Sequence, residues 1–147
     1  MDREFYMAAA LALAKEAAAE GEVPVGAVIA DENGRIIGRG RNRCEALGAT
    51  RHAEVEAIEE ASRHLGRWRL EGCSLYVTLE PCPMCAGAVI NARVPTLVYG
   101  TKEPKTGACG SVLNLFEERF GFRPAIYGGV LEAECAAVLR DFFQTLR

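Results

Sequence analysis

The stretch that decides the fold begins with His52-Ala53-Glu54 and ends with Pro81-Cys82-Pro83-Met84-Cys85. The first motif opens residues 51–65, whose apolar residues recur with helical spacing. The second motif opens another predicted helix at residues 82–92. Between them, the β-branched and aromatic run at residues 74–79 predicts a strand. The polar residues of both motifs are therefore expected at the N-terminal ends of two helices joined through one strand.

The ends of these two helices follow common capping preferences. Thr50 is a candidate N-cap for the first helix, and Gly66 would end it. Pro81 suits the first turn of the second helix, because the N–H that proline lacks has no partner at that position. The side chains expected to face inward from the first helix are those of Val55, Ile58 and Ala61.

The rest of the chain continues the alternation of helices and strands. The remaining predicted elements are a helix at 2–20, a hairpin of strands at 25–30 and 36–42 around the Asp31-Glu32-Asn33-Gly34 turn, strands at 96–99 and 125–127, a glycine-rich loop at 105–110, a short helical segment at 112–116 and a closing helix at 131–146. This pattern predicts one α/β domain over residues 1–147. Its mixed five-stranded sheet would be covered by helices on both faces, giving three α-β-α layers.

Composition narrows the class of protein. The 147 residues are 50% hydrophobic and 25% charged, which is typical of a globular domain. No signal-peptide pattern or membrane-spanning run is found, so we expect a cytoplasmic location and no membrane partner. Close cysteine pairs in that compartment usually bind metal or carry out redox chemistry. The cysteines without ligand spacing are interpreted as small core or loop residues: Cys44, Cys73, Cys109 and Cys135.

The charge distribution leaves two interpretations open. A net charge of -3 argues weakly against binding to a polyanion. Between residues 35 and 51, however, arginine occurs at positions 35, 39, 41, 43 and 51 against one acid, Glu45. This stretch is either a local basic face or an ordinary solvated strand edge.

The side chains of His52, Cys82 and Cys85 are good zinc ligands. Three protein ligands leave a fourth tetrahedral position open, as in catalytic zinc sites, and a helix N-terminus favours thiolate over thiol. Glu54 can lie beside the metal without ligating it and take a proton from water. The alternative is a redox Cys82-x-x-Cys85 pair, with His52 and Glu54 as surface residues. Together, the two motifs favour catalytic zinc.

His-x-Glu followed by Pro-Cys-x-x-Cys resembles the signature of the zinc nucleobase deaminases of the cytidine and deoxycytidylate deaminase superfamily. The chain is most similar to the bacterial tRNA adenosine deaminases. The stretches that carry this resemblance outside the histidine motif are Glu22–Val28, Leu75–Cys82, Met84–Ala88, Lys105–Gly107 and Asp141–Phe143. The resemblance implies a cytidine-deaminase-like fold, one zinc ion per subunit and a homodimer. The apolar segment 86–90 is either a candidate interface for that dimer or an ordinary core helix. It also implies hydrolysis of adenosine to inosine at the wobble position of a tRNA anticodon stem-loop.

The same resemblance implies roles for individual residues. His52, Cys82 and Cys85 would hold zinc, and Glu54 would move protons. The residues that would contact the substrate are Pro24, Val25, Asn42, Lys105, Thr106, Phe142 and Phe143. Taken without the resemblance, Asn42 is a turn residue that ends a strand, and the two phenylalanines are helix core.

Two other functions share these motifs. One is a deaminase of a free base or nucleoside, such as guanine or cytosine, and the other is a noncatalytic RNA-binding subunit with structural zinc. The segment 105–107 and the closing helix favour the tRNA substrate, and Glu54 argues against structural zinc. Arg51 stands where many bacterial members have alanine, and Glu103 stands where aspartate is common. Both residues bear on nucleotide contacts.

Overall fold

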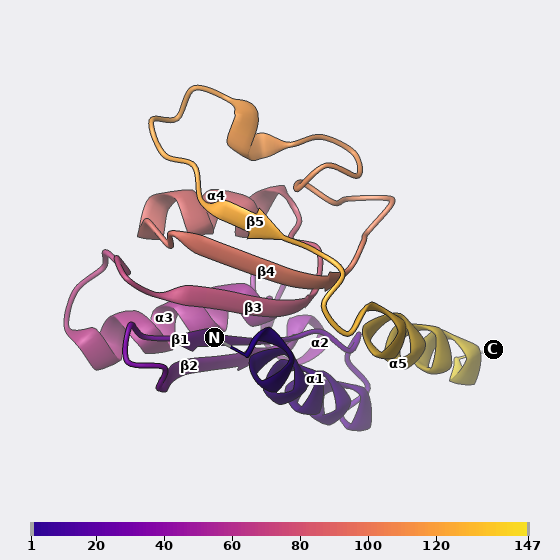
Figure 1. Cartoon of the computed structure of the whole chain (residues 1–147). Coiled ribbons are helices and arrows are strands. Elements are labelled where there is room, and N and C mark those ends of the chain that lie inside the picture. The colour runs from indigo at the N-terminus through magenta and orange to yellow at the C-terminus, as the bar shows by residue number, and fades with distance from the viewer. Residues whose placement is uncertain (1, 147) are drawn as a thin grey trace.

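A computed structural model describes residues 2–146. Its strands form one five-stranded sheet in the order β2-β1-β3-β4-β5, shown in Figure 1. The strands are β1 (Gly26–Ala30), β2 (Ile36–Arg41), β3 (Ser74–Leu79), β4 (Thr96–Thr101) and β5 (Ala125–Tyr127). β1 is antiparallel to both β2 and β3, whereas β3, β4 and β5 are parallel. The predicted mixed five-stranded sheet is confirmed.

Helices cover both faces of this sheet (Figure 1). Helices α1 (Arg3–Ala19) and α5 (Glu132–Thr145) lie on one face, and α3 (Ala53–Leu65) and α4 (Pro83–Ala92) lie on the other. A short helix, α2 (Cys44–Leu47), and a 3-10 turn, η1 (Leu115–Glu117), complete the described elements. The three α-β-α layers are as predicted, whereas α2 was not expected. No helix within residues 2–146 combines the length and apolarity needed to cross a bilayer.

The core consists of two layers, one on each side of the sheet, because neighbouring strand residues point to opposite faces. Ile29, Val77 and Leu97 pack toward α3 and α4. Val28 and Val98 pack toward α1 and α5. All six cysteines are free, and those outside the motifs are buried (Cys73, Cys135) or half-buried (Cys44, Cys109). Their interpretation as core or loop residues is consistent with these positions.

Helix α3 packs on β2 through its smallest side chains. A Cβ atom on Gly40 would lie 2.1 Å from the carbonyl oxygen of Ala53, and one on Gly38 would lie 2.3 Å from that of Ala57. The buried residues of the helix are Ala53, Glu54, Ala57 and Ala61. The expected inward position is confirmed for Ala61, and Ile58 is half-buried but packs against the core. The expected inward position of Val55 was wrong, since it is half-buried and lies outside both core clusters. The two glycines let the helix backbone approach the strand, and the small side chains of alanine face them across this contact.

The starts of α3 and α4 differ from the sequence-based expectation. The N-cap of α3 is His52 rather than Thr50, and the N-cap of α4 is Cys82. Pro83, not Pro81, occupies the first turn of α4. Neither N-cap side chain accepts a hydrogen bond from its own helix. Both side chains are free for other contacts, and those contacts form the candidate site.

Candidate active site

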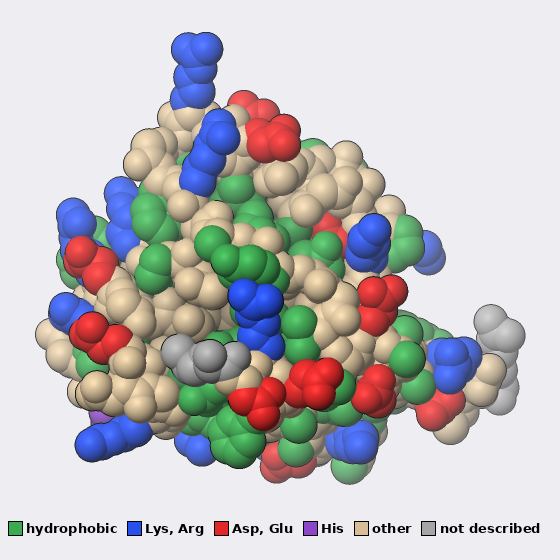
Figure 2. Space-filling model, viewed as in Figure 1, with side chains coloured by type: hydrophobic (Ala, Val, Ile, Leu, Met, Phe, Trp, Pro, Cys, Tyr) green, Lys and Arg blue, Asp and Glu red, His purple; other side chains and the backbone are tan. Residues whose placement is uncertain are grey.

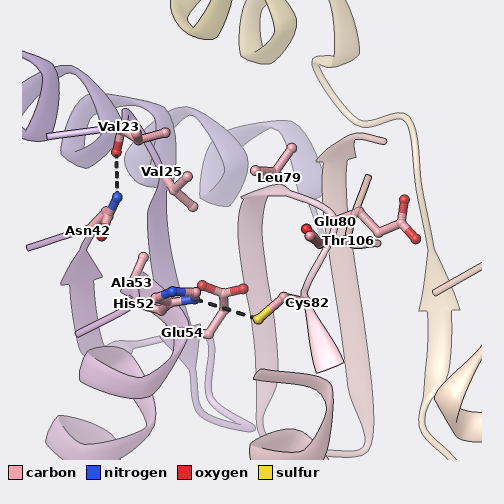
Figure 3. Close-up of a pocket in the computed structure, with 10 residues that line it drawn as sticks. All are labelled: Val23, Val25, Asn42, His52, Ala53, Glu54, Leu79, Glu80, Cys82 and Thr106. Carbon is pink, nitrogen blue, oxygen red and sulfur yellow. Dashed lines mark hydrogen bonds between the residues drawn. The ribbon is translucent and has the colours of Figure 1, made fainter. Parts of the chain in front are cut away.

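The side chains of His52, Cys82 and Cys85 meet where α3 and α4 begin, and Figure 3 shows His52 and Cys82 of this group. The Nδ1 atom of His52 lies 3.6 Å from the Sγ atom of Cys82 and 3.4 Å from the Sγ atom of Cys85. The three possible ligand atoms all lie within 4.8 Å of one another. The structure therefore brings together the three residues that the sequence motifs single out.

The spacing of these atoms fits a zinc ion. Tetrahedral bonds of about 2.3 Å to sulfur and about 2.1 Å to nitrogen place those two atoms roughly 3.6 Å apart. The two sulfur-to-nitrogen distances, 3.6 and 3.4 Å, are close to that value. One imidazole and two thiols also form a donor set that zinc prefers.

Within the cluster, protons are shared unequally between the two thiols. A hydrogen bond from Cys85, together with one from His52, lowers the pKa of Cys82 to about 4 although burial opposes ionisation. The hydrogen bond to Cys82 and burial raise the pKa of Cys85. The hydrogen bond with Cys82 also raises the pKa of His52. The cluster therefore holds a thiolate next to a histidine that gains a proton easily, and a bound dication would replace the shared protons.

Glu54 lies beside this cluster, in the first turn of α3 (Figure 3). Its side chain is only 4% exposed. Burial is the main reason why the pKa of Glu54 rises to about 7, and the nearby Cys82 thiolate raises it further. A carboxyl group with a pKa near neutrality both accepts and returns protons at cellular pH. Glu54 thus has the position and the acidity of a general acid–base group.

A cavity of about 210 Å³ opens over these residues. The side chains that line it, all drawn in Figure 3, are Val23, Val25, Asn42, His52, Ala53, Glu54, Leu79, Glu80, Cys82 and Thr106. Its volume lies below the roughly 300 Å³ of the smallest pockets for drug-sized ligands. The cavity therefore suits one flat ring system with apolar walls, rather than a whole nucleotide.

Three of the residues expected to contact substrate line this cavity: Val25, Asn42 and Thr106. The Asn42 side chain donates through Nδ2 to the carbonyl oxygen of Val23 at 3.1 Å, and its Oδ1 accepts from the N–H of Cys44 at 3.1 Å. Nδ2 of Asn42 can still donate one more hydrogen bond, and its Oδ1 can still accept one more. Asn42 therefore ends the β2 strand as a turn residue and can still contact a ligand.

The other expected contact residues lie outside the cavity. Pro24 is buried behind the wall, and Lys105 is exposed on the loop that carries Thr106. Phe142 is half-buried on α5 and Phe143 is 47% exposed, so neither is a fully buried core residue. Both phenylalanines line a second depression, of about 260 Å³, which shares Val23 and Asn42 with the first cavity. They are positioned beside the cavity, not inside it.

Four lining residues were missed by sequence reasoning: Val23, Ala53, Leu79 and Glu80. Glu80 is the most informative of them, because it is a carboxylate that is only 2% exposed. Burial opposes its ionisation, yet hydrogen bonds from Ser111 and from backbone N–H groups lower the pKa of Glu80. The available signal was an acidic residue directly after the apolar run of β3. The cavity is therefore bordered by two buried carboxyl groups, Glu54 and Glu80, whose pKa values are shifted in opposite directions.

The arginine-rich stretch does not form a free basic face. Three of its five arginines form ion pairs: Arg41 with Glu20 at 2.8 Å, Arg43 with Glu56 at 3.2 Å and Arg51 with Glu59 at 2.9 Å. The guanidinium of Arg51, which precedes His52, donates hydrogen bonds to both carboxylate oxygens of Glu59. Figure 2 shows acidic and basic side chains interspersed over the visible face. The interpretation as an ordinary solvated strand edge, with three of its arginines in ion pairs, therefore fits better than that of a local basic face.

Known proteins resemble this chain over nearly its whole length. A family model described as MafB19-like deaminase matches residues 1–147. The tRNA-specific adenosine deaminase of Bacillus subtilis (strain 168) is 51% identical over 146 residues, which cover 98% of this chain and 90% of that protein. The tRNA(Ile)-lysidine synthase of Deinococcus deserti is 54% identical over 142 residues, 96% of this chain but only 27% of that protein. This chain therefore spans about a quarter of the length of the Deinococcus protein.

A solved structure supports the same relationship. It comes from work on A-to-I editing by tRNA:A34 deaminases at the wobble position of transfer RNA. It is 43% identical to this chain, superposes with a TM-score of 0.88, and the match covers 92% of this chain and 99% of the other. The fold expected from the motif resemblance is confirmed. On the match to the whole sequence and the identity to full-length relatives, the chain belongs to the MafB19-like deaminase family.

Proposed function

We propose that the chain is a cytoplasmic tRNA adenosine deaminase, which converts adenosine to inosine at the wobble position of an anticodon with one deaminase domain at residues 1–147. The observation that carries this proposal is Glu54, a buried carboxyl group with a pKa of about 7, beside the His52, Cys82 and Cys85 cluster. The tRNA substrate is supported by the Bacillus subtilis relative and by the tRNA:A34 deaminase structure.

The reaction needs a water molecule that is nucleophilic near neutral pH. We infer that one zinc ion per chain would be held by His52 Nδ1 and the Sγ atoms of Cys82 and Cys85, whose spacing fits it. The chemistry that zinc supplies when bound is to lower the pKa of water. Glu54 accepts one proton from the attacking water and delivers it to N1 of adenine. It then transfers the second proton to the departing amine, so that inosine and ammonia are the products.

The size of the cavity fits a single base turned out of its strand. Anticodon-loop bases are partly unstacked, so that turning one out costs less than opening a duplex. Within the cavity, Val25, Asn42 and Thr106 would contact this base, and Pro24 would shape the wall behind Val25. Exposed aromatic side chains stack on nucleotides in many single-strand sites. The contacts with flanking nucleotides are therefore proposed for Lys105, Phe142 and Phe143.

The substrate can be tested directly. The purified, zinc-loaded protein would be incubated with an anticodon stem-loop that carries adenosine at the wobble position, and separately with free adenosine, guanine and cytosine. We expect inosine in the stem-loop and no ammonia from the small molecules. Turnover of a small molecule alone would replace tRNA with a free base or nucleoside. A folded, zinc-loaded protein without any turnover would favour the noncatalytic RNA-binding subunit.

We also propose a homodimer. In the segment 86–90, Ala86, Val89 and Ile90 are buried in the core of this chain, so they are not available to a partner. The exposed apolar side chains near α4 and η1 are those of Met84, Val112, Leu113 and Phe120. Their burial would stabilise a second copy of the chain. Size-exclusion chromatography with light scattering is expected to give twice the chain mass, and a monomer at assay concentration would contradict the proposal.

A further inference from the structure

In the part of the chain that the structure describes, the hydrogen bonds to the carboxylate of Glu80 all come from the loop that follows β4. We call residues 102–111 the rim loop, because its Thr106 lines the edge of the cavity. Oε1 of Glu80 accepts from the N–H of Glu103 at 3.1 Å and from the Ser111 hydroxyl. Oε2 accepts from the N–H of Cys109 at 2.9 Å and from the N–H of Ser111 at 3.1 Å. Glu80 therefore binds the rim loop near both of its ends.

The backbone of the rim loop also binds Pro81, the residue that follows Glu80. The N–H of Ala108 donates to the carbonyl oxygen of Pro81 at 2.8 Å, and the N–H of Gly107 donates to that of Glu103 at 2.9 Å. A Cβ atom on Gly107 would lie 2.5 Å from the Glu80 carboxylate, so only glycine allows this approach. Thr106 precedes this glycine directly. The place of Thr106 in the cavity wall is thus fixed by contacts with residues 80 and 81.

These contacts differ from those of an ordinary buried ion pair. Among residues 2–146, no lysine, arginine or histidine side chain forms a salt bridge with Glu80. Its charge is balanced by the N–H and O–H dipoles of one loop. Figure 3 shows the Glu80 carboxylate turned away from His52 and Cys82. Glu80 is therefore placed to hold the loop, not to touch the metal ligands or a base in the cavity.

We propose that Glu80 is a positioning residue, which sets the affinity for RNA by holding the rim loop where Thr106 and Lys105 meet the substrate. This inference rests on the proposed function, because the rim loop matters only if a ligand enters the adjoining cavity. Loss of the carboxylate would free the loop without removing a metal ligand or the proton carrier. Binding of the substrate would weaken, whereas the chemical step would be largely preserved.

The test compares E80Q, E80A and S111A with the control D31A. Asp31 also accepts backbone N–H groups, those of Asn33 and Arg35 at 3.0 Å each, but it does so in the β1–β2 turn away from the cavity. For each variant, KM and kcat would be measured on the wobble-adenosine stem-loop, together with zinc content. Hydrogen exchange would be followed in peptides that cover residues 102–111.

We expect E80Q to raise KM about tenfold with kcat changed by less than about threefold, since a hydrogen bond to a charged group contributes roughly one order of magnitude in affinity. S111A removes one of the donors to Glu80 and is expected to raise KM less, in the same direction. Hydrogen exchange should quicken in the rim loop of both variants. D31A should lower the melting temperature without raising KM. If E80A or E80Q does not fold, S111A carries the test.

Three results would overturn the proposal: an unchanged KM in folded E80Q, a fall in kcat alone, or unchanged exchange in the rim loop. Loss of zinc from E80Q would also contradict the proposal. The rise in KM would then come from a displaced zinc ligand, Cys82, and not from the rim loop. An inactive wild-type protein would contradict the proposed function instead. The exchange measurement needs no turnover, so the two failures are distinguishable.

Discussion

Glu54→Gln is expected to lower kcat about 10²- to 10⁴-fold while the chain still binds one zinc ion, because the amide keeps the size of the carboxyl group but cannot carry a proton. The side chain is 4% exposed, so bulk water cannot readily take over the transfer. Its pKa of about 7 indicates a group that changes its charge easily at neutral pH. Single-turnover assays on the stem-loop, with zinc content measured on the same samples, would check this result.

The matched control is Glu60→Gln, on the same helix. Glu60 is exposed and accepts a hydrogen bond from the N–H of Arg39 at 2.9 Å, far from the lining of the cavity. We expect this variant to retain wild-type turnover. Near-normal kcat in zinc-loaded Glu54→Gln would exclude Glu54 as the proton carrier.

Cys85→Ala is expected to abolish both zinc binding and turnover. Cys85 is fully buried, and its Sγ atom lies 3.4 Å from His52 Nδ1. Loss of one of three ligands should weaken zinc binding by more than the roughly 10- to 100-fold typical of changes around a metal site's ligands. Zinc content after dialysis against a weak chelator would check this, together with activity on the stem-loop.

The control for this variant is Cys73→Ala. Cys73 is also a buried cysteine, but it lies in the core outside the metal-ligating group. Replacing this small core side chain by a slightly smaller one should lower the stability of the fold a little. The variant should still bind one zinc ion per chain. Full activity of Cys85→Ala with stoichiometric zinc would mean that Cys85 is not a ligand.

The sequence predicts well where a local pattern and the tertiary structure agree. The bounds of β3 and β5 are those expected from their β-branched and aromatic runs, and both strands lie in the parallel part of the sheet. The meeting of His52 with Cys82 and Cys85, which lie 30 and 33 positions away, is predicted by the zinc-ligand types in the two motifs rather than by local structure. Each motif begins a helix next to β3, and the short connections leave little freedom in how these helix ends are placed.

Features that depend on distant contacts could not be predicted. Thr50 is a better N-cap than histidine by local preference, but His52 takes that position because its side chain is used in the cluster. The short helix α2 begins where the buried carboxylate of Glu22 accepts the N–H groups of Glu45 and Ala46, at 2.9 Å each. Residues more than twenty positions apart make these contacts, so no local window contains them.

The inward face of α3 shows a related limit. Hydropathy favours valine over alanine for burial, which is why Val55 was expected inside together with Ile58 and Ala61, and only Val55 lies outside the core. Opposite the glycines of β2 the helix backbone comes close to the strand, and alanines occupy the helix positions that face it. Steric fit between two elements that are distant in the sequence decided the face, and hydrophobicity alone did not.

The ion pairs of the arginine stretch bear on how an RNA would be held. Arg41 already has a carboxylate partner at the C-terminal end of α1, and Arg43 and Arg51 have partners on α3. An RNA phosphate that approached them would exchange one anion for another, and few condensed counterions would leave the nucleic acid. These three arginines should therefore add little to the dependence of the RNA affinity on ionic strength. Selection would then depend on which nucleotide fits the cavity, more than on the total charge of the strand that carries it.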